Sequence, residues 1–181
     1  MDRADVKRSK RLAAVLRHRP ESVGIALDRH GWVHVDLLLN ALAAHGSAMT
    51  RQDLDRVIRN NDKQRFEWDR DADLIRARQG HSVEVDLGLA PVTPPDVLFH
   101  GTPRRDVESI LATGLDRRGR HHVHLSVDLA TAHRVGARRG DHVVLEVEAG
   151  RMAHDGFAFY LSSNGVWLTD EVPPEYLSQL L

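Results

Sequence analysis

The chain has 181 residues, of which 41% are hydrophobic and 28% are charged, a balance typical of a folded globular protein and not of a disordered one. It contains no cysteine, which excludes disulfides, thiolate metal sites and a cysteine nucleophile. Residues 1–90 carry 16 Lys/Arg against 14 Asp/Glu, and residues 91–181 carry 9 against 12, so the net charges are +2 and −3. This balance predicts local anion sites instead of a broad basic surface.

The first residues of the sequence are charged and form no apolar run of the kind found in signal peptides. No segment approaches the length of a membrane span. We therefore expect a cytoplasmic protein without a membrane partner. A monomer is expected because the sequence leaves no long apolar surface stripe unassigned.

The first half of the chain follows helix and strand patterns in a recognisable order. A helix is predicted over Asp5–Arg19, because Val6, Leu12, Val15 and Leu16 share one face, and Pro20 ends it. The segments predicted after it are a strand at Trp32–Val35, a helix at Leu37–Ala44 capped by Asp36, a helix from a capping box at Thr50 to Asn60, and strands at Arg65–Trp68 and Leu74–Ala77. This order describes a winged-helix-like lobe.

A stretch rich in proline and glycine, Leu87–Pro95, is the best candidate for a linker between two domains, which we place at residues 1–90 and 91–181. The second half reads as an α+β domain with short strands. Its predicted elements are strands at Val97–His100, Val123–Ser126, Val143–Glu148, Phe157–Leu161 and Val166–Thr169, a helix capped by Thr102-Pro103 that runs to Gly114, a helix at Asp128–Ala137, and a turn or helix after Pro173-Pro174.

Three stretches of the first half carry groups suited to a phosphate. Two of them are basic: Arg17-His18 stands just before Pro20, and Lys63 and Arg65 lie between a helix and a strand. Each also fits an ordinary role, as a helix cap or a solvated loop. The third follows the second ribbon strand, where the side chains of Gln79, His81 and Ser82 could hold an oxyanion.

Histidines stand out in the second half. His100-Gly101-Thr102 lies at a predicted strand-to-helix junction, where glycine admits a ligand to the backbone and a helix N-terminus favours an anion. His121, His122 and His124 precede Ser126, but alternate residues of a strand face one way and no carboxylate or cysteine accompanies them. We therefore expect no metal.

Two further stretches complete the set. Arg138 and Arg139 end a helix and fit either a plain cap or an anion site, and the turn around Asn164 leads into an apolar strand with Trp167. None of these stretches is decisive alone. The informative observation is their order along the chain: LRHRP, GWVHV, NDKQRFE, RARQGHS, LFHGT, HHVHLS, VGARRG and SSNGVWLT.

This ordered set resembles the RNA 2′-phosphotransferases, the enzymes that finish tRNA splicing in fungi, from about Ser9 to Tyr176. The resemblance implies an N-terminal winged-helix-like lobe that binds RNA and its 2′-phosphate, followed by a C-terminal ADP-ribosyltransferase-like lobe that binds NAD. It also implies a reaction in which NAD is consumed, no metal takes part and an RNA with an internal 2′-phosphate is the partner. The products implied are 2′-OH RNA, nicotinamide and ADP-ribose 1″,2″-cyclic phosphate, formed through an ADP-ribosylated RNA phosphate.

Carried onto this sequence, the resemblance assigns catalytic roles to Arg17, His18, Arg65 and Arg138, with Arg139 as the alternative to Arg138. It assigns NAD binding to His100, Gly101, Thr102, His124, Ser126 and Asn164, and substrate contacts to Lys63, Gln79, His81 and Ser82. Arginine suits a phosphate that gathers charge during transfer, because it stays protonated and forms bidentate contacts. His18 is able either to move a proton or to donate a hydrogen bond.

Two other functions are weighed against this one. An ADP-ribosyltransferase acting on terminal phosphates of RNA or DNA would stop after the first step and would not need the full phosphate clamp. A winged-helix regulator without catalysis would bind duplexes and ignore NAD, but the near-neutral charge of residues 1–90 disfavours it.

Overall fold

The computed structural model describes residues 2–61 and 63–180, apart from the side chain of Arg139. The chain forms two compact units, Met1–Gly88 and Leu89–Leu181. Within the described residues there are six α-helices and four small antiparallel sheets, so the protein belongs to the α+β class, as the sequence predicts. No helix of the described residues is long and apolar enough to cross a bilayer.

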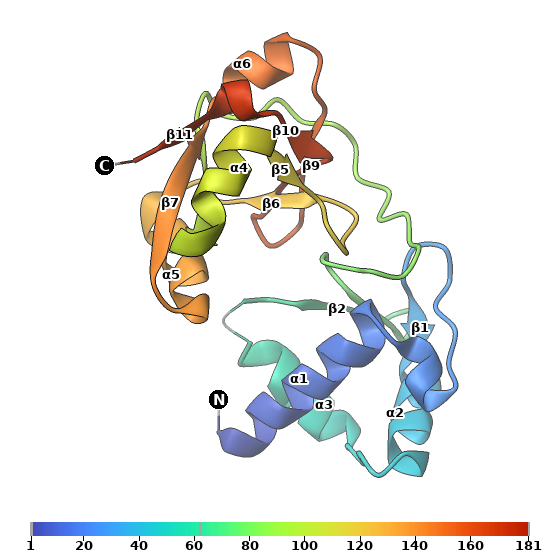
Figure 1. Cartoon of the computed structure of the whole chain (residues 1–181). Helices are drawn as coiled ribbons and strands as arrows, with labels where there is room; N and C mark the ends of the chain where they lie inside the picture. Colours follow the sequence, from blue (N-terminus) through green and yellow to red (C-terminus); the bar gives the residue numbers. More distant parts are fainter. Residues whose placement is uncertain (1, 62, 181) are drawn as a thin grey trace. The chain divides into compact units, whose positions relative to one another are not determined.

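The first unit consists of three helices and a three-stranded sheet, coloured blue to green in Figure 1. Its elements are α1 Arg3–Arg17, the 3-10 helix η1 Pro20–Val23, β1 Val33–His34, α2 Val35–Ala44, α3 Arg51–Arg59, β2 Phe66–Asp69 and β3 Leu74–Ala77. The strand order is β1-β3-β2, with Val33 opposite Ile75 and Phe66 opposite Ala77. Apolar side chains from all three helices and the sheet, including Leu12, Leu38 and Leu54, form one buried core.

Local sequence explains most of the boundaries in the first unit. Chain breaking at Pro20 ends α1 at Arg17, with His18 as its C-cap. Thr50 and Asp53 form the capping box predicted for α3, each side chain bonding the backbone N–H of the other. The prediction that Asp36 caps the second helix is wrong, because α2 begins at Val35 with His34 as the N-cap.

Tertiary packing accounts for that difference. Val35 is fully buried and its N–H bonds the carbonyl of Asp73 next to β3, which draws the helix start back by two residues. Asp36 then lies in the first turn, and its carboxylate binds Arg51 at 2.6 Å. A cross-element ion pair thus occupies the side chain that local pattern assigns to a cap.

The second unit is built on two three-stranded antiparallel sheets, β11-β7-β4 and β6-β9-β8, with a small β10-β5 pair. Its strands are β4 Leu98–Pro103, β5 Leu115–Asp116, β6 Val123–Leu125, β7 His142–Val147, β8 Phe159–Leu161, β9 Trp167–Thr169, β10 Glu171–Val172 and β11 Leu177–Gln179. Its helices are η2 Arg104–Asp106, α4 Val107–Thr113, α5 Leu129–Gly136, η3 Ala137–Arg139, α6 Ala149–His154 and η4 Pro174–Tyr176.

One prediction for this unit is wrong at a position that matters for the candidate site. Thr102-Pro103 does not cap an α-helix, because β4 continues through Pro103 along β7, with Thr102 opposite Val143, and Pro103 is the N-cap only of the 3-10 helix η2. A 3-10 turn follows, and α4 starts only at Val107. Gly101 is therefore in the interior of a strand, and the expected helix N-terminus is not adjacent to it. The helix α6 and the strands β5, β10 and β11 have no counterpart among the predicted elements.

Acid should weaken the first unit by protonating carboxylates that accept hydrogen bonds in the folded state. Hydrogen bonds from the Thr50 backbone and from Arg56 lower the pKa of Asp53 from 3.8 to about 2, and Arg56 also lowers the pKa of the 2% exposed Asp5. Because both pKa values are lower in the folded state, the stabilisation is complete above pH 3.8 and is lost as the pH falls toward 2. In urea unfolding, Asp53→Asn should be less stable than wild type at pH 7, and the difference should shrink below pH 3.8. A difference independent of pH would contradict this.

Candidate functional site

The C-terminus of α1 places the Arg17-His18 pair where a second segment holds it. The N–H groups of His18 and Arg19 both bond the carbonyl of Ala14 at 3.2 and 2.9 Å, closing the last turn. The N–H of Ser82, in the segment after β3, donates to the carbonyl of Arg17 at 2.9 Å. Its hydroxyl lies 3.0 Å from Nδ1 of His18. The segment after β3 is thus fastened to the backbone and to the imidazole at the end of α1.

The Ser82–His18 hydrogen bond limits what the imidazole does with its two nitrogens. A hydroxyl can donate to Nδ1, in which case Nε2 of neutral His18 carries the proton, or it can accept from a protonated Nδ1. Either arrangement fixes the ring orientation. Ser82, which the sequence assigned to substrate, is therefore also placed to orient His18.

The neighbouring residues of the same stretch differ from one another in exposure. His81 is only 1% exposed, and a Cβ at the left-handed Gly31 would lie 3.4 Å from its Nε2. This packing favours a supporting role for His81 over direct contact with a polymer. Gln79 is half-buried in the turn just before it, and its predicted contact with substrate stays a prediction.

A buried asparagine organises the second basic stretch. Asn61 is 3% exposed, and its Oδ1 accepts from the backbone N–H of Lys63 and from Nη1 of Arg65, both at 3.2 Å. Its Nδ2 donates to Ser9 Oγ of α1 at 3.1 Å. One amide therefore ties the loop and the Arg65 side chain to α1. The hydrogen bonds around Asn61 and those around Ser82 form two separate local groups in the first unit.

Asn61 lies within the NDKQRFE stretch, but it is not among the predicted site residues. A pattern was available: an asparagine after a helix often bonds the backbone N–H two residues on, as Asn61 does with Lys63. The contact with Ser9 spans 52 residues and has no counterpart in local pattern.

In the second unit, a strand bridge brings three predicted NAD-binding residues together. The backbone of Phe99 in β4 exchanges two hydrogen bonds with Ser126, at 2.9 and 2.8 Å, which joins the two sheets. Beside this bridge, Nδ1 of His100 bonds the carbonyl of His124 at 3.1 Å. Because a carbonyl only accepts, Nδ1 of His100 carries the proton, and Nε2 of the neutral ring is an acceptor.

His124 takes the opposite tautomer. Arg120 Nη1 lies 3.1 Å from Nδ1 of His124, and because a guanidinium only donates, that nitrogen is the acceptor and Nε2 holds the proton. The two imidazoles thus differ in the nitrogen that offers a proton. Arg120 was missed by sequence analysis, since it lies on the exposed loop before β6, where no periodicity marks it.

Gly101 has a packing reason for its lack of a side chain. A Cβ there would lie 2.0 Å from the carbonyl oxygen of Ala132 and 2.8 Å from the nitrogen of Gly136, both in α5. The close approach of α5 to β4 therefore requires glycine, whether or not a ligand also approaches. Thr102 is 3% exposed, which places its side chain in the interior.

The remaining predicted residues lie on surface turns. Arg138 is exposed on η3, which follows α5 and contacts β4; the side chain of Arg139, the alternative, is outside the described residues. Asn164 is in a tight turn, where its Oδ1 accepts from Ser162 Oγ at 2.8 Å. Within the residues that the structure describes, no group of three or more metal-ligating side chains is found.

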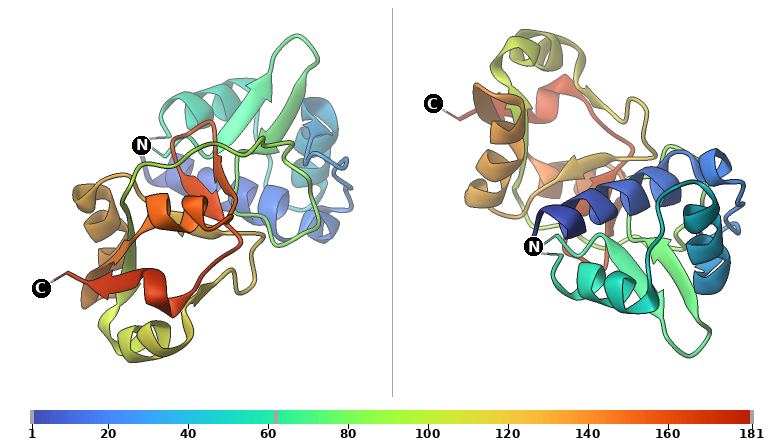
Figure 2. Two further views of the ribbon diagram at one scale, coloured as in Figure 1. Left: turned by 90° about the horizontal axis from the view of Figure 1, so that it is seen from above. Right: turned by 90° about the horizontal axis from the view of Figure 1, so that it is seen from below.

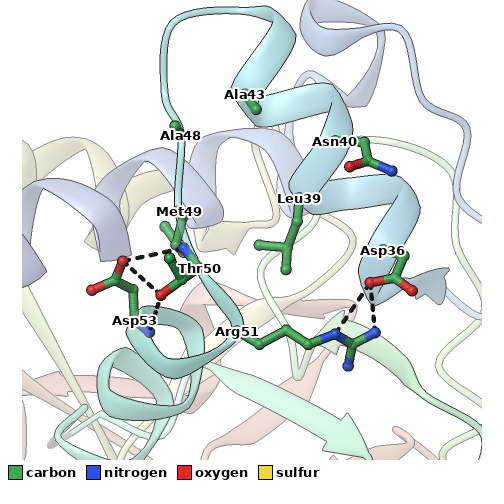
Figure 3. Close-up of a pocket in the computed structure, with 9 residues that line it drawn as sticks. All are labelled: Asp36, Leu39, Asn40, Ala43, Ala48, Met49, Thr50, Arg51 and Asp53. Carbon is green, nitrogen blue, oxygen red and sulfur yellow. Dashed lines mark hydrogen bonds and ion pairs between the residues drawn. The ribbon is translucent and has the colours of Figure 1, made fainter.

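A hollow of about 410 Å³ lies elsewhere in the first unit, at the start of α3 (Figure 3). Its floor is apolar, with Leu39 and Met49, and its rim carries Asp36, Arg51 and Asp53. The rim groups already bind one another or the Thr50 cap. None of the predicted site residues lines it, so this hollow is not where we place the chemistry.

Comparison with known proteins defines the class to which this arrangement belongs. A family model described as "RNA 2'-phosphotransferase, Tpt1 / KptA family" matches residues 3–171, which include every predicted site residue. The chain therefore belongs to the RNA 2′-phosphotransferase family, as the resemblance of its motifs predicts.

Curated relatives cover nearly the whole chain. A protein of Nostoc punctiforme is 54% identical over 97% of both chains, and one of Streptomyces coelicolor is 54% identical over 95% of this chain and 93% of its own. A protein of Hahella chejuensis is 50% identical over 99% of this chain and 97% of its own. Each is named "Probable RNA 2'-phosphotransferase".

Removing the Ser82 hydroxyl should disturb His18 without unfolding the protein, because Ser82 is exposed. We expect Ser82→Ala to lower turnover of a 2′-phosphorylated RNA about tenfold, the scale of one hydrogen bond to a reacting group. The pH profile of kcat should also shift, and Ser82→Thr, which keeps the hydroxyl, should restore both. An unchanged pH profile would show that the serine does not orient His18.

Asn61→Ala should affect both stability and the loop. The substitution leaves Ser9 without its partner in a buried position, which should lower the free energy of unfolding by about 1–3 kcal/mol in urea titrations. It also releases Arg65, so kcat should fall even at temperatures where the variant is fully folded. Full activity of the folded variant would mean that Arg65 does not need Asn61.

Proposed function

We propose that this protein is an NAD-dependent RNA 2′-phosphotransferase, a transferase that removes an internal 2′-phosphate from RNA. The observation that carries the proposal is the family match over residues 3–171, which contains both groups of site residues. The names of the curated relatives support the same transferase class.

The two units supply different halves of this chemistry in the proposal. We assign the first unit, whose order is helix, strand, helix, helix and ribbon, as a winged-helix-like lobe that binds the RNA 2′-phosphate. We assign the second, with its paired three-stranded sheets, as an ADP-ribosyltransferase-like lobe that binds NAD. NAD is a co-substrate in this assignment, and no metal takes part.

The reaction has two steps. An oxygen of the RNA 2′-phosphate attacks C1″ of the nicotinamide ribose of NAD, and nicotinamide leaves. The ribose 2″-hydroxyl then attacks the phosphorus, which releases RNA with a 2′-hydroxyl and ADP-ribose 1″,2″-cyclic phosphate. The attacking phosphate is already an anion, so the first step needs orientation more than a base.

Residues of the first unit would hold the phosphate. Arg17 and Arg65 are permanently charged donors that neutralise the phosphoryl oxygens, where negative charge increases in the second step. We propose that the Ser82 hydroxyl donates to Nδ1 of His18, so that Nε2 donates to the phosphate. Lys63, whose backbone Asn61 fixes next to Arg65, adds a further cation.

Two histidines of the second unit, His100 and His124, are our candidates for binding the ribose hydroxyls of NAD. The ribose hydroxyls both donate and accept, and His100 Nε2 as acceptor with His124 Nε2 as donor offers the complementary pair. Asn164 and the backbone of Gly101 are our candidates for the carboxamide. Besides Arg17, Arg65 and Lys63, the reaction is assigned one cation from the second unit. Arg138 stays a candidate for it, and we add Arg120, because the bond to His124 places the Arg120 guanidinium beside a candidate NAD-binding histidine.

The direct test is to incubate the purified protein with a short RNA bearing one internal 2′-phosphate, with and without NAD, and to follow the products by mass spectrometry. Loss of the phosphate only with NAD, together with ADP-ribose cyclic phosphate, is the expected result. Accumulated ADP-ribosylated RNA would point to an enzyme of the first step alone. No change in the RNA under either condition would overturn the proposal.

Single substitutions should separate the two roles. Arg65→Ala should leave the dissociation constant for NAD near its wild-type value and lower kcat roughly a hundredfold, since a guanidinium on a transferring phosphate contributes on the order of 3 kcal/mol. His100→Ala should instead weaken NAD binding, measured by calorimetry without RNA. Our assignment of each residue would be wrong if the two variants showed the same pattern.

A further inference from the structure

A row of cations on α1 leads to Arg17, and its other members have no role in the proposed reaction. At 100° per residue, Arg3, Lys7, Lys10 and Arg17 lie within about 80° of arc on one face of the helix, with Ala14 completing the row. Arg3, Lys7 and Lys10 are exposed, and Arg17 is half-buried. We call these four cations the α1 stripe. No carboxylate of α1 lies on this face, since Asp5 is buried on the opposite one.

The opposite face of α1 explains why the stripe points away from the core. Leu12, Val15 and Leu16 are fully buried, and α1 packs against α3 on that side. Figure 2 shows α1 as one uninterrupted helix along the side of the first unit. The stripe is therefore a straight surface feature, about 21 Å long from residue 3 to residue 17 at 1.5 Å per residue.

Several arginines of this unit bind carboxylates. On α3, Arg51 binds Asp36 and Asp73, Arg56 binds Asp5 and Asp53, and Arg59 binds Asp55. On the ribbon, Arg70 binds Asp55 and Arg76 binds Glu67. On α1, Arg8 binds Asp5 and Asp53.

The stripe differs in this respect. Among the described residues, Arg3, Lys7 and Lys10 have no ion pair within 4.0 Å. Arg11 lies beside them, and its enclosed Nε has no hydrogen-bond partner in the part of the chain that the structure describes. Among the described residues, the exposed cations of α1 thus lack the carboxylate partners that the arginines of α3 have, and α3 is the helix that a duplex-reading winged-helix protein would present.

The stripe ends at Arg17 and His18, the residues assigned to the 2′-phosphate. We propose that the α1 stripe binds the backbone of the RNA strand that flanks the 2′-phosphate. This inference rests on the proposed function and extends it from a phosphate to an oriented strand. Single cations spaced three, four and seven residues apart contact phosphates without reading bases, so the surface selects RNA length and not sequence.

The number of cations in the stripe determines how strongly RNA binding should depend on salt. Each phosphate contact on a single strand contributes about 0.7 to the slope of log affinity against log salt. Replacing Lys7 and Lys10 should therefore reduce the slope by about 1.4 and weaken binding on the order of tenfold near 0.1 M salt. A protein with net charge −1 can thus bind RNA through a short, local track.

The test compares two double variants with equal charge change, Lys7→Gln/Lys10→Gln on the stripe and Arg59→Gln/Arg70→Gln on exposed, ion-paired positions. Fluorescence anisotropy measures the affinity of each for a 12-nucleotide RNA with one central 2′-phosphate, at several salt concentrations and without NAD. The stripe variant should lose affinity and salt slope as stated, and the control variant should stay within about twofold of wild type. With a three-nucleotide RNA, the loss in the stripe variant should be several-fold smaller.

Three outcomes would overturn the proposal. Equal losses in both double variants would indicate general charge attraction, and an unchanged slope in the stripe variant would mean that RNA does not contact Lys7 or Lys10. In a vesicle sedimentation assay, the stripe variant could lose the binding to phosphatidylserine vesicles that wild type shows, while its RNA affinity stays unchanged. That result would assign the stripe to a membrane surface. Because anisotropy needs no turnover, absence of the NAD-dependent reaction would refute the proposed function separately.

Discussion

The structure of the first unit depends on how α1 is ended and held. Pro20 stops the helix at Arg17, and the segment that returns after β3 bonds the last turn through the backbone and hydroxyl of Ser82. The same helix is tied to the loop carrying Arg65 through Ser9 and Asn61. The side chains of His18 and Arg65 are thereby held by hydrogen bonds with Ser82 and Asn61, and the backbone carbonyl of Arg17 is held by the N–H of Ser82. Such preorganisation is what electrostatic catalysis of phosphoryl transfer requires.

Charged side chains of the first unit differ in whether they form ion pairs. Carboxylates bind the arginines of α3 and the ribbon, which fixes helix to helix and helix to sheet. Such exposed pairs add little stability each, but they cancel positive potential over the surface that they cover. Among the described residues, Arg3, Lys7 and Lys10 on α1 have no such carboxylate partner, and they form a row that leads to the C-terminus of the helix. Near-neutral composition therefore coexists with a local site for a polyanion.

In the second unit, close packing and strand pairing replace charge as the organising factor. The missing side chain of Gly101 lets α5 approach β4, and the bridge from Phe99 to Ser126 joins the two sheets beside His100. Two histidines from different strands then hold opposite tautomers because one bonds a carbonyl and the other a guanidinium. A pair of this kind distinguishes donor from acceptor on a ligand, which two solvent-exposed histidines do not.

The sequence by itself determined the family, the α+β class and most element positions, because periodicity, Pro20 and the Thr50 capping box act locally. It also predicts phosphate-binding roles for Arg17, His18 and Arg65, and these roles stay predictions. Only the tertiary structure decided that Asp36 binds Arg51 instead of capping a helix, that β4 continues through Thr102, and that Asn61 and Arg120 contact site residues. The physical reason is separation along the chain. The hydrogen bond between Ser82 and His18 joins residues 64 positions apart, and sequence patterns reflect only interactions between residues that are close along the chain.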